Sequence, residues 1–353
     1  MNPKITIANR PIGPGCPAYI IAEMSANHGQ DFDQALMILE AAREAGADAV
    51  KLQTYTADTL TISCDTEPFR IRGTAWAGRN LHDLYQEAYT PWDWQPKLVA
   101  AAAAMGLHCF STPFDESAVD FLEAIAVPAH KVASFELVDL ALLRKIASTG
   151  KPVIMSTGMA TLAEIDEAVT TLRRGGCHEI ALLKCTSAYP APAGAMNLRT
   201  IPHLAQTFDV VAGLSDHSLG VAAPVTAVAL GASVIEKHLT LSRAAGGPDS
   251  GFSLEPDEFK AMVTAVREAE QALGTVSYSV TAGEMASRAF RRSLFVVRDI
   301  KAGEIFSADT IRSIRPGHGL SPRYLDLALG RRAAVDIQRG TPLAWEHIGE
   351  AAA

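Results

Sequence analysis

The sequence has few cysteines, and they show no pairing pattern. The five cysteines are Cys16, Cys64, Cys109, Cys177 and Cys185, and no two of them form a CxxC pair. An odd and scattered set does not suit a disulfide framework. We therefore expect reduced thiols in a protein of the cytoplasm.

The chain also lacks any apolar run of transmembrane length and any excess of positive charge. Its opening residues, MNPKITIANRPIG, contain no apolar core of a signal peptide. The 31 Lys and Arg residues are outnumbered by 39 Asp and Glu residues, which gives a net charge of −8 and argues against nucleic acid or an anionic membrane as a partner. Lysines that bind an anion must therefore be concentrated locally.

The most informative feature that is present is a series of eight short apolar runs, each ending in polar residues. Segments of helix length separate the runs. Alternating strands and helices predict a parallel sheet, and eight repeats predict a (β/α)8 TIM barrel. The runs are Ala18–Ser25, Ala49–Thr54, His108–Pro113, Ala129–Ser134, Pro152–Thr157, Ile180–Cys185, Val210–Ser215 and Val234–Leu239.

Several segments between the runs have the spacing of an amphipathic helix. The last barrel helix is predicted over Pro256–Leu273, because proline and acidic residues suit a helix start. The long stretch from Tyr55 to Trp94 is rich in aromatics, and it either shapes a pocket or is a packed excursion. Two other stripes are Ala35, Ile38, Leu39 and Ala42, and Leu162, Ile165, Val169 and Leu172.

The pattern of the chain changes after about residue 290, where short runs alternate with glycine turns. We expect a barrel domain over residues 1–280, with a hairpin or lid over about 1–17 beneath the barrel. A linker over 281–290 would lead to a small domain over 291–353. A domain of that size has a small core but is viable if it docks onto something else.

Residues at the C-terminal ends of barrel strands are the candidates for function. Charged residues are seldom buried unless paired, so charged side chains near the lumen ends are costly for stability alone. Those residues are Lys51, Lys131, Lys184 and Glu236. Because side chains alternate along a strand, three pairs are predicted to face the lumen together. The pairs are Lys51 with Gln53, Ser215 with His217, and Glu236 with His238.

Two kinds of site follow from these strand ends. The imidazoles of His217 and His238 suit a divalent ion with open positions for substrate, although a lone lumen histidine is more often simply hydrogen-bonded. Glu23 would orient or deprotonate a water, or pair with a lysine. The lysines and neighbouring hydroxyls suit a phosphate and a carboxylate, although some hydroxyls only end strands or cap helices. These hydroxyls belong to Thr112, Ser134, Ser156 and Ser215.

Ordered motifs over nearly the whole chain resemble the sialic acid synthase family. The small C-terminal domain resembles the antifreeze-like (SAF) domain of that family, including the loop Arg315-Pro316-Gly317. The motifs are Ile21–His28, Gly46–Thr54, Phe110–Asp115, Lys184–Pro190, Gly213–His217 and Ile235–His238.

The resemblance implies condensation of phosphoenolpyruvate with an acylamino sugar, assisted by manganese, magnesium or cobalt, with manganese favoured. His217 and His238 match the metal ligands, and Glu23 matches the residue that handles the water. Arg315 matches an arginine delivered by the partner subunit of a domain-swapped homodimer. The matched phosphoenolpyruvate contacts are Lys51, Thr112, Lys131, Ser134, Ser156, Ser187 and Ser215. Lys184 is added to them because it is predicted at the same rim of strand ends. On the sugar side the matches are Gln53, Tyr189, Asp249 and the catalytic Glu236.

Within the family, segments 25–28, 51–56, 84–92 and 246–256 resemble the members that make pseudaminic acid. Lys184 and Ser187 stand where sialic acid synthases commonly carry histidine and asparagine. The implied acceptor is then 2,4-diacetamido-2,4,6-trideoxy-L-altrose. Synthesis of N-acetylneuraminic or legionaminic acid is the alternative. A Schiff-base aldolase that uses Lys184 is more remote, and an ice- or sugar-binding protein without catalysis would leave the lumen lysines and histidines unexplained.

Overall fold

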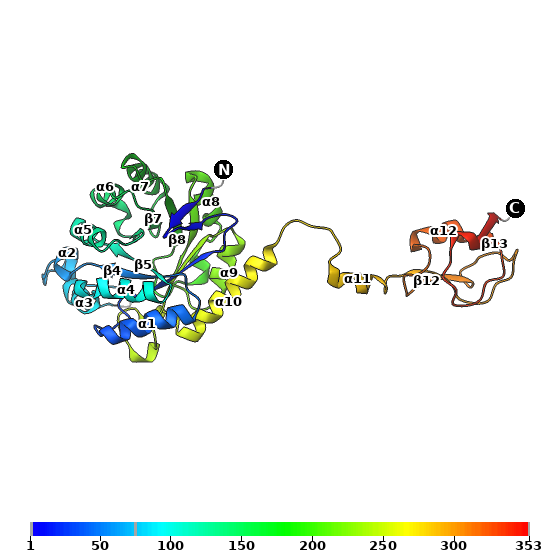
Figure 1. Ribbon diagram of the computed structural model, residues 1–353, viewed down its shortest axis with the longest axis horizontal. Helices are drawn as coiled ribbons and strands as arrows, with labels where there is room; N and C mark the ends of the chain where they lie inside the picture. The colour runs from blue at the N-terminus through cyan, green and yellow to red at the C-terminus, as the bar shows by residue number, and fades with distance from the viewer. Residues whose placement is uncertain (1–2, 74–75, 352–353) are drawn as a thin grey trace. The chain divides into compact units, whose positions relative to one another are not determined.

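The chain separates into two compact units. The computed structural model describes residues 3–73 and 76–351. The units are Met1–Gly274 and Thr275–Ala353, so the division falls a few residues before the expected boundary at residue 280 (Figure 1). Within the described residues, no helix is long and apolar enough to cross a membrane.

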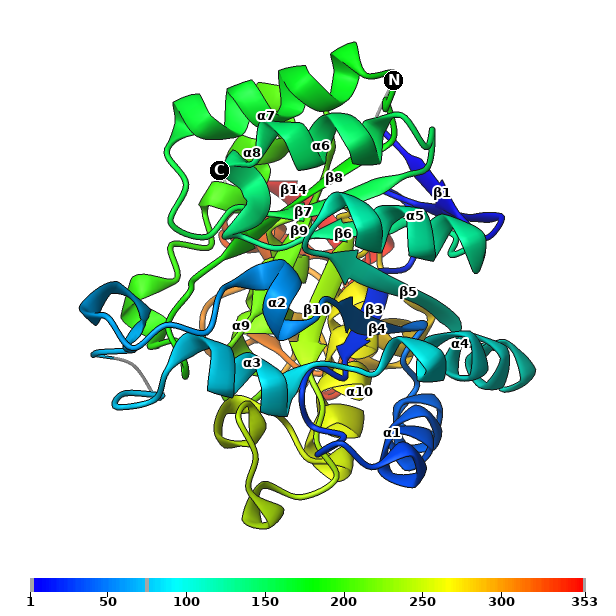
Figure 2. The same cartoon turned by 90° about the vertical axis from the view of Figure 1, so that its left-hand side faces the viewer.

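Unit 1 contains a closed barrel of parallel strands, which confirms the predicted TIM barrel. All eight predicted runs overlap a barrel strand, and β10 closes the ring by pairing with β3. Figure 2 shows the strands in the centre with helices around them. The strands are β3 (Tyr19–Glu23), β4 (Ala49–Thr54), β5 (His108–Pro113), β6 (His130–Val132), β7 (Val153–Ser156), β8 (Ile180–Cys185), β9 (Val211–Asp216) and β10 (Val234–His238).

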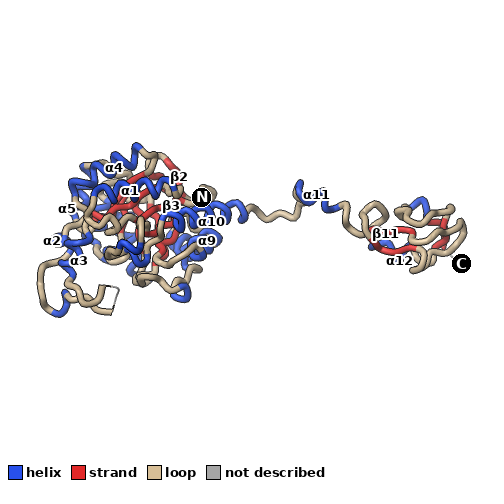
Figure 3. Tube along the Cα trace, turned by 90° about the horizontal axis from the view of Figure 1, so that it is seen from below, coloured by secondary structure: helices blue, strands red, loops and turns tan. Residues whose placement is uncertain are grey.

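An outer layer of helices covers the barrel, as the blue tube segments around the red strands in Figure 3 show. Side chains cap several of these helices: Asp31 accepts hydrogen bonds from Asp33 N and Gln34 N at the start of α1. The helices are α1 (Phe32–Glu44), α4 (Gln95–Ala104), α5 (Glu116–Ala124), α6 (Leu140–Ala147), α7 (Leu162–Arg174), α8 (Thr200–Phe208), α9 (Ala222–Ala229) and α10 (Pro256–Leu273). The predicted bounds of α10 are confirmed.

One predicted apolar stripe is partly wrong. Ile165, Val169 and Leu172 are buried against the barrel, but Leu162 is 54% exposed. Leu162 is the first residue of α7, directly after its N-cap Thr161. The stripe of α1 is buried throughout.

A second apolar layer fills the N-terminal half of the barrel interior. The predicted hairpin is present as β1 (Ile5–Ile7) paired with β2 (Arg10–Ile12). Its residues Ile5, Ile7 and Ile12 are buried and join the cluster of strand residues inside the barrel. The hairpin therefore closes the end of the barrel opposite the polar strand ends.

Unit 2 has its own small apolar core, formed by residues such as Leu294, Phe306 and Leu343. All residues from 271 to 292 are exposed, and part of the expected linker is helical. The elements are α11 (Ala282–Arg288), β11 (Ser293–Val296), β12 (Ile311–Ile314), α12 (Leu325–Ala328), β13 (Arg331–Ala333) and β14 (Ile348–Ala351).

Candidate active site

A cavity of about 380 Å³ lies at the C-terminal ends of the barrel strands. It brings together most of the residues predicted from the sequence. Those lining it are Lys51, Gln53, Lys131, Ser134, Ser156, Tyr189, Ser215, His217, Glu236, His238 and Asp249.

The alternation of side chains along each strand explains this convergence. Ala49 on β4 and Val234 on β10 belong to the apolar cluster inside the barrel. Lys51 and Glu236 come two residues later on the same strands and face the same lumen, where they line the cavity. All three predicted lumen-facing pairs reach the cavity, so the parity prediction is confirmed.

Two buried lysines and two buried carboxylates form one network in the lumen. Lys51 forms an ion pair with Glu23, and its Nζ lies 3.7 Å from Glu236 Oε1. Lys131 Nζ lies 3.9 Å from the same oxygen of Glu236. Each lysine also donates to a hydroxyl, Lys51 to Thr112 at 3.2 Å and Lys131 to Ser156 at 2.7 Å. Lysine cations and hydroxyl groups therefore point at a common space, as binding of an anion requires.

The network separates the two carboxyl groups chemically. Burial raises the pKa of Glu23 to about 7, because burial outweighs the attraction of Lys51. Burial would also raise the pKa of Glu236, but Lys131 and Lys51 outweigh it and hold that pKa below its usual value. Glu236 is thus a permanent anion at neutral pH, whereas Glu23 can take or release a proton there.

A group of hydroxyls lies beside the lysines and is packed around a glycine. Gly158 N donates to Ser134 Oγ at 3.0 Å. A Cβ atom at Gly158 would lie 2.3 Å from Ser187 Oγ and 2.7 Å from Ser134 Oγ. Only a glycine allows these two hydroxyls to approach the backbone so closely. Ser187 is therefore at the site, although it does not line the cavity itself.

The rings of His217 and His238 lie with their centroids 5.2 Å apart. His217 Nδ1 is 3.1 Å from the carbonyl oxygen of Thr186. A carbonyl only accepts, so Nδ1 donates, and Nε2 keeps its lone pair in the neutral form of the ring. Burial, together with the neighbouring His217, holds the pKa of His238 well below its usual value, so this ring is neutral.

Among the described residues, His238 Nδ1 is a buried nitrogen without a hydrogen-bond partner. An unpaired buried nitrogen on a neutral ring and a free lone pair on its neighbour fit a cation between them. No group of three His, Cys, Asp or Glu side chains within residues 3–73 and 76–351 is arranged to hold a metal. Two histidine nitrogens would leave open positions for water or substrate on an ion that they held.

An aromatic and apolar wall encloses the other side of the cavity. The Tyr189 ring lies 4.5 Å from His217 and 4.9 Å from Phe252, measured between centroids. Trp76 Nε1 donates to Pro248 O at 2.8 Å, which ties the excursion after β4 to the loop after β10. The excursion, including α2 (Ala57–Leu60) and α3 (Leu81–Ala88), shapes the pocket. Its lining residues are Tyr55, Leu60, Ile71, Trp76, Leu81, Leu84, Tyr85 and Ala88.

The structure corrects the predicted position of Lys184. Ala181 and Leu183 of β8 face the barrel interior, so alternation places Cys185 there and turns Lys184 away. Lys184 Nζ donates to Cys185 O at 2.8 Å and does not line the cavity. Cys185 occupies the lumen position that was predicted for the lysine.

Three other predicted residues lie outside the cavity lining, for two different reasons. Glu23 and Thr112 are buried behind Lys51, which each of them contacts. Arg315 is exposed in unit 2, directly after β12. Thr112 and Glu23 therefore lie beside Lys51, and Arg315 belongs to the other unit.

Sequence reasoning missed two ionisable residues that line the cavity, Glu136 and Cys185. Glu136, in a short turn after β6, has a pKa raised to about 7 by burial, and its Oε2 is buried without a partner among the described residues. Burial would raise the pKa of Cys185, but the contact with His217 lowers it to about 7. Strand parity applied to β8 would have found Cys185, whereas Glu136 follows no strand or helix period.

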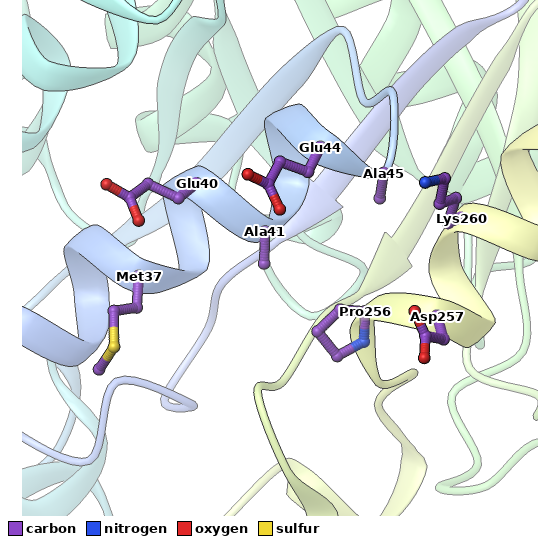
Figure 4. Close-up of a pocket in the computed structure, with 8 residues that line it drawn as sticks. All are labelled: Met37, Glu40, Ala41, Glu44, Ala45, Pro256, Asp257 and Lys260. Carbon is purple, nitrogen blue, oxygen red and sulfur yellow. The ribbon is translucent and has the colours of Figure 1, made fainter.

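A second hollow, of about 250 Å³, lies between α1 and the start of α10 (Figure 4). It contains none of the predicted site residues. Its lining consists of Met37, Glu40, Ala41, Glu44, Ala45, Pro256, Asp257 and Lys260.

Comparison with known proteins identifies the family of the chain. A family model described as the NeuB family matches residues 37–278, and the SAF domain matches residues 291–349. The pseudaminic acid synthase of Campylobacter jejuni subsp. jejuni serotype O:23/36 (strain 81-176) is 46% identical over 325 residues, which cover 92% of this chain and 95% of that protein. The pseudaminic acid synthase of Helicobacter pylori (strain ATCC 700392 / 26695) is 43% identical over 333 residues, covering 94% of this chain and 98% of that protein.

Solved structures are similar over most of the chain. The N-acetylneuraminic acid synthetase of Leptospira borgpetersenii serovar Hardjo-bovis in complex with citrate matches with a TM-score of 0.72 and 32% identity, covering 81% of this chain and 95% of that one. The spore coat polysaccharide biosynthesis protein SpsE of Bacillus subtilis matches with a TM-score of 0.67 and 37% identity, covering 98% and 99%. The chain therefore belongs to the NeuB family, the sialic acid synthases that its motifs resemble.

Proposed function

We propose that this chain is a pseudaminic acid synthase. It would condense phosphoenolpyruvate with 2,4-diacetamido-2,4,6-trideoxy-L-altrose and water to give pseudaminic acid and phosphate. The observation that carries the proposal is one cavity with an anion-binding side at Lys51 and Lys131 and an apolar side from the excursion after β4. The similarity to the pseudaminic acid synthase of Campylobacter jejuni supports the choice of sugar.

The lysine side of the cavity suits phosphoenolpyruvate. Lys51 and Lys131 would bind its phosphate and carboxylate, and Ser134, Ser156 and Ser187 would fix their direction. In the free enzyme the two lysines are within 4.0 Å of Glu236 or paired with Glu23. The bound anion would therefore replace these carboxylates as the partner of the lysines. The lysines are then never buried without a negative partner.

The reaction forms one carbon–carbon bond, and at the phosphate-bearing carbon a bond to the oxygen of water replaces the bond to the oxygen of phosphate. The enol carbon of phosphoenolpyruvate attacks the aldehyde carbon of the sugar, and the aldehyde oxygen takes up a proton. The phosphate-bearing carbon becomes electron-poor, and water adds to it. Glu23, whose pKa is near 7, would take the proton that this water gives up. The intermediate then expels phosphate and leaves the keto group of the product.

We further propose a divalent ion, manganese in preference to magnesium or cobalt, held by His217 and His238. The free lone pair on His217 and the unpaired nitrogen of the neutral His238 support this assignment. When bound, the ion would supply Lewis-acid polarisation of the sugar aldehyde. Tyr189, Gln53 and Asp249 would orient the sugar from the same end of the cavity.

The apolar wall supports a deoxy sugar as the acceptor. Leu60, Ile71, Leu81 and Leu84 line the cavity on the side of the excursion. A sugar whose 6-position is a methyl group would bury it there, whereas a 6-hydroxyl would lose hydrogen bonds to water on that wall. The alternatives, N-acetylneuraminate and legionaminate synthesis, keep the same mechanism and differ in this contact.

We propose a domain-swapped homodimer in which Arg315 completes the partner's sugar site. The two units carry opposite net charges: residues 1–274 contain 20 basic and 31 acidic residues, giving −11, and residues 275–353 contain 11 and 8, giving +3. Opposite charges favour docking of the small unit onto a barrel. The five cysteines are free thiols, which suits the proposed location in the cytoplasm.

Phosphate release from phosphoenolpyruvate by the purified protein with manganese tests the proposal. The reaction is run with the trideoxy-altrose sugar, with its legionaminic-type counterpart and with N-acetylmannosamine, each with and without a chelator. We expect chelator-sensitive release with the altrose sugar alone. Release only with N-acetylmannosamine would overturn the choice of sugar, and no release with any sugar would overturn the function.

A further inference from the structure

Asp216 and Lys237 form an ion pair that is completely buried in the wall of the barrel. Lys237 Nζ lies 2.5 Å from Asp216 Oδ2, and both side chains are 0% exposed. The two residues are direct partners in the register of β9 and β10. Strand alternation turns both away from the lumen, and neither lines the active-site cavity. The proposed reaction therefore has no direct use for either charge.

The pair also holds the backbone beside His217. Ser218 N donates to Asp216 Oδ1 at 2.8 Å. Lys237 Nζ donates to the carbonyl oxygen of Ser218 as well as to Asp216. The turn that presents His217 is thus fixed from both sides by one carboxylate and one ammonium group. The ammonium group belongs to β10, the strand that also carries His238.

Stability alone does not account for this arrangement. Lys237 projects toward the layer between barrel and helices, where its strand neighbours Ile235 and Leu239 belong to the apolar core. Removing two charges from water costs about as much as their attraction returns, and apolar side chains of similar volume are often as stable. Apolar contacts, unlike hydrogen bonds and ion pairs, do not fix which atoms meet. The charged pair ties two strand ends together at fixed atoms.

We propose that Asp216 and Lys237 are positioning residues that set the spacing of His217 and His238 for a divalent cation. Each histidine follows one member of the pair by a single residue, and the two rings lie 5.2 Å apart. The inference rests on the proposed metal site. Without the pair, the turn at residues 216–218 loses three hydrogen bonds, while the lumen residues keep theirs.

The test is Mn²⁺ binding, measured by titration calorimetry and by the electron paramagnetic resonance signal of free Mn²⁺. The central variant is the double substitution Asp216→Leu with Lys237→Met, which leaves no unpaired charge. We expect it to unfold in chelator within a few degrees of the wild type but to bind Mn²⁺ roughly 10–100-fold more weakly, the usual effect of losing a group that orients a metal ligand. Excess Mn²⁺ should restore most of kcat.

Asp216→Asn serves as a second variant in case the double variant does not fold. Asparagine keeps the shape and the acceptor for Ser218 N, so we expect an intermediate loss of Mn²⁺ affinity. Arg267→Met is the control, because it breaks the pair with Asp48, 3.1 Å long, at the other end of the barrel. It should lower the unfolding temperature and leave Mn²⁺ affinity unchanged.

The outcomes separate this inference from the proposed function. If His217→Ala or His238→Ala abolishes Mn²⁺ binding and a folded variant of the pair binds as tightly as the wild type, the positioning role is wrong. If the wild type binds no Mn²⁺, or if the histidine variants bind it normally, the metal site itself is wrong and the inference falls with it. Weaker binding by the pair variants, but not by Arg267→Met, supports the inference.

Discussion

Glu23 and Lys51 occupy facing positions on β3 and β4, and their side chains form an ion pair inside the barrel. Both are buried, and the pKa of Glu23 is nevertheless raised to about 7, because burial outweighs the attraction of the lysine. The pKa of Lys51 is raised as well, since Glu23 and Glu236 outweigh its burial. The lysine therefore stays charged for an anion, while the carboxyl group can exchange a proton at neutral pH.

This carboxyl group predicts a pH dependence of catalysis. If Glu23 accepts the proton of the water, only its ionised form is active, so kcat/KM rises as pH increases through about 7. Glu23→Gln should lower kcat by about 10²–10⁴-fold and abolish that rise. The measurement is a pH profile of phosphate release for both proteins. If kcat/KM of the variant still rose with pH through about 7, Glu23 would not be the proton acceptor.

The same shift predicts a pH dependence of stability. The pKa of Glu23 in the folded protein, about 7, lies above its usual value of 4.5. Between these values the folded state holds a proton that the unfolded chain has lost, so the contribution of this group to stability falls as pH rises. Glu23→Gln should flatten that decline between about pH 4.5 and pH 7. Urea unfolding at several pH values measures it, and parallel curves for the two proteins would count against the shift.

Gly158→Ala should damage the phosphoenolpyruvate side selectively. The new Cβ would overlap Ser187 Oγ at 2.3 Å and Ser134 Oγ at 2.7 Å, and such overpacking costs about 1–3 kcal/mol. We expect KM for phosphoenolpyruvate to rise at least tenfold with little change in KM for the sugar. Gly194→Ala is the matched control, since a Cβ there meets nothing within 4 Å. Equal effects of the two variants would refute the assignment.

Lys184→Met tests the alternative Schiff-base mechanism. Because Lys184 turns away from the lumen and bonds to Cys185 O, its loss should change kcat/KM less than about threefold, below 1 kcal/mol. Lys51→Met and Lys131→Met should each lower kcat/KM by more than about 100-fold, since they remove a buried cation from the anion site. Borohydride with pyruvate should trap no adduct. A trapped adduct on Lys184 would support the Schiff-base aldolase mechanism instead.

Leu81→Ser tests the choice of sugar. Leu81 lines the cavity on the side of the excursion, and contact with one methyl group contributes about 1 kcal/mol. KM for the trideoxy sugar should rise about threefold to tenfold, KM for phosphoenolpyruvate should stay the same, and discrimination against a sugar with a 6-hydroxyl should decrease. Leu162→Ser, at an exposed position of α7, is the control. Unchanged discrimination would place the 6-position elsewhere.

Most of the barrel and its lumen residues were predictable, because a strand buried on both faces leaves a short apolar run and its alternation is strict. Lys51 and Gln53, or Glu236 and His238, could be assigned to one face from their spacing alone. The same rule applied to β8 would have selected Cys185, and the error at Lys184 came from giving more weight to residue type than to parity.

Other parts of the site have no local signal in the sequence. Glu136 lies in a turn after β6, and it lines the cavity together with residues of the excursion, which are distant in the chain. Gly158 reads as an ordinary loop glycine until Ser134 and Ser187 are seen to converge on it. These contacts join segments that are distant in the chain, so no periodicity reports them.

The isoleucines of the β1–β2 hairpin leave the barrel open at one end only. Ile5, Ile7 and Ile12 close the N-terminal end of the barrel together with the apolar lumen residues. Substrates and products therefore enter and leave at the C-terminal ends of the strands. Lys51 and Lys131 lie on strands, deep in the lumen, whereas Tyr189 and Asp249 lie on loops near its opening. If Lys51 and Lys131 bind phosphoenolpyruvate, as we propose, we expect it to bind before the sugar, since a bound sugar would block the way to the lysines.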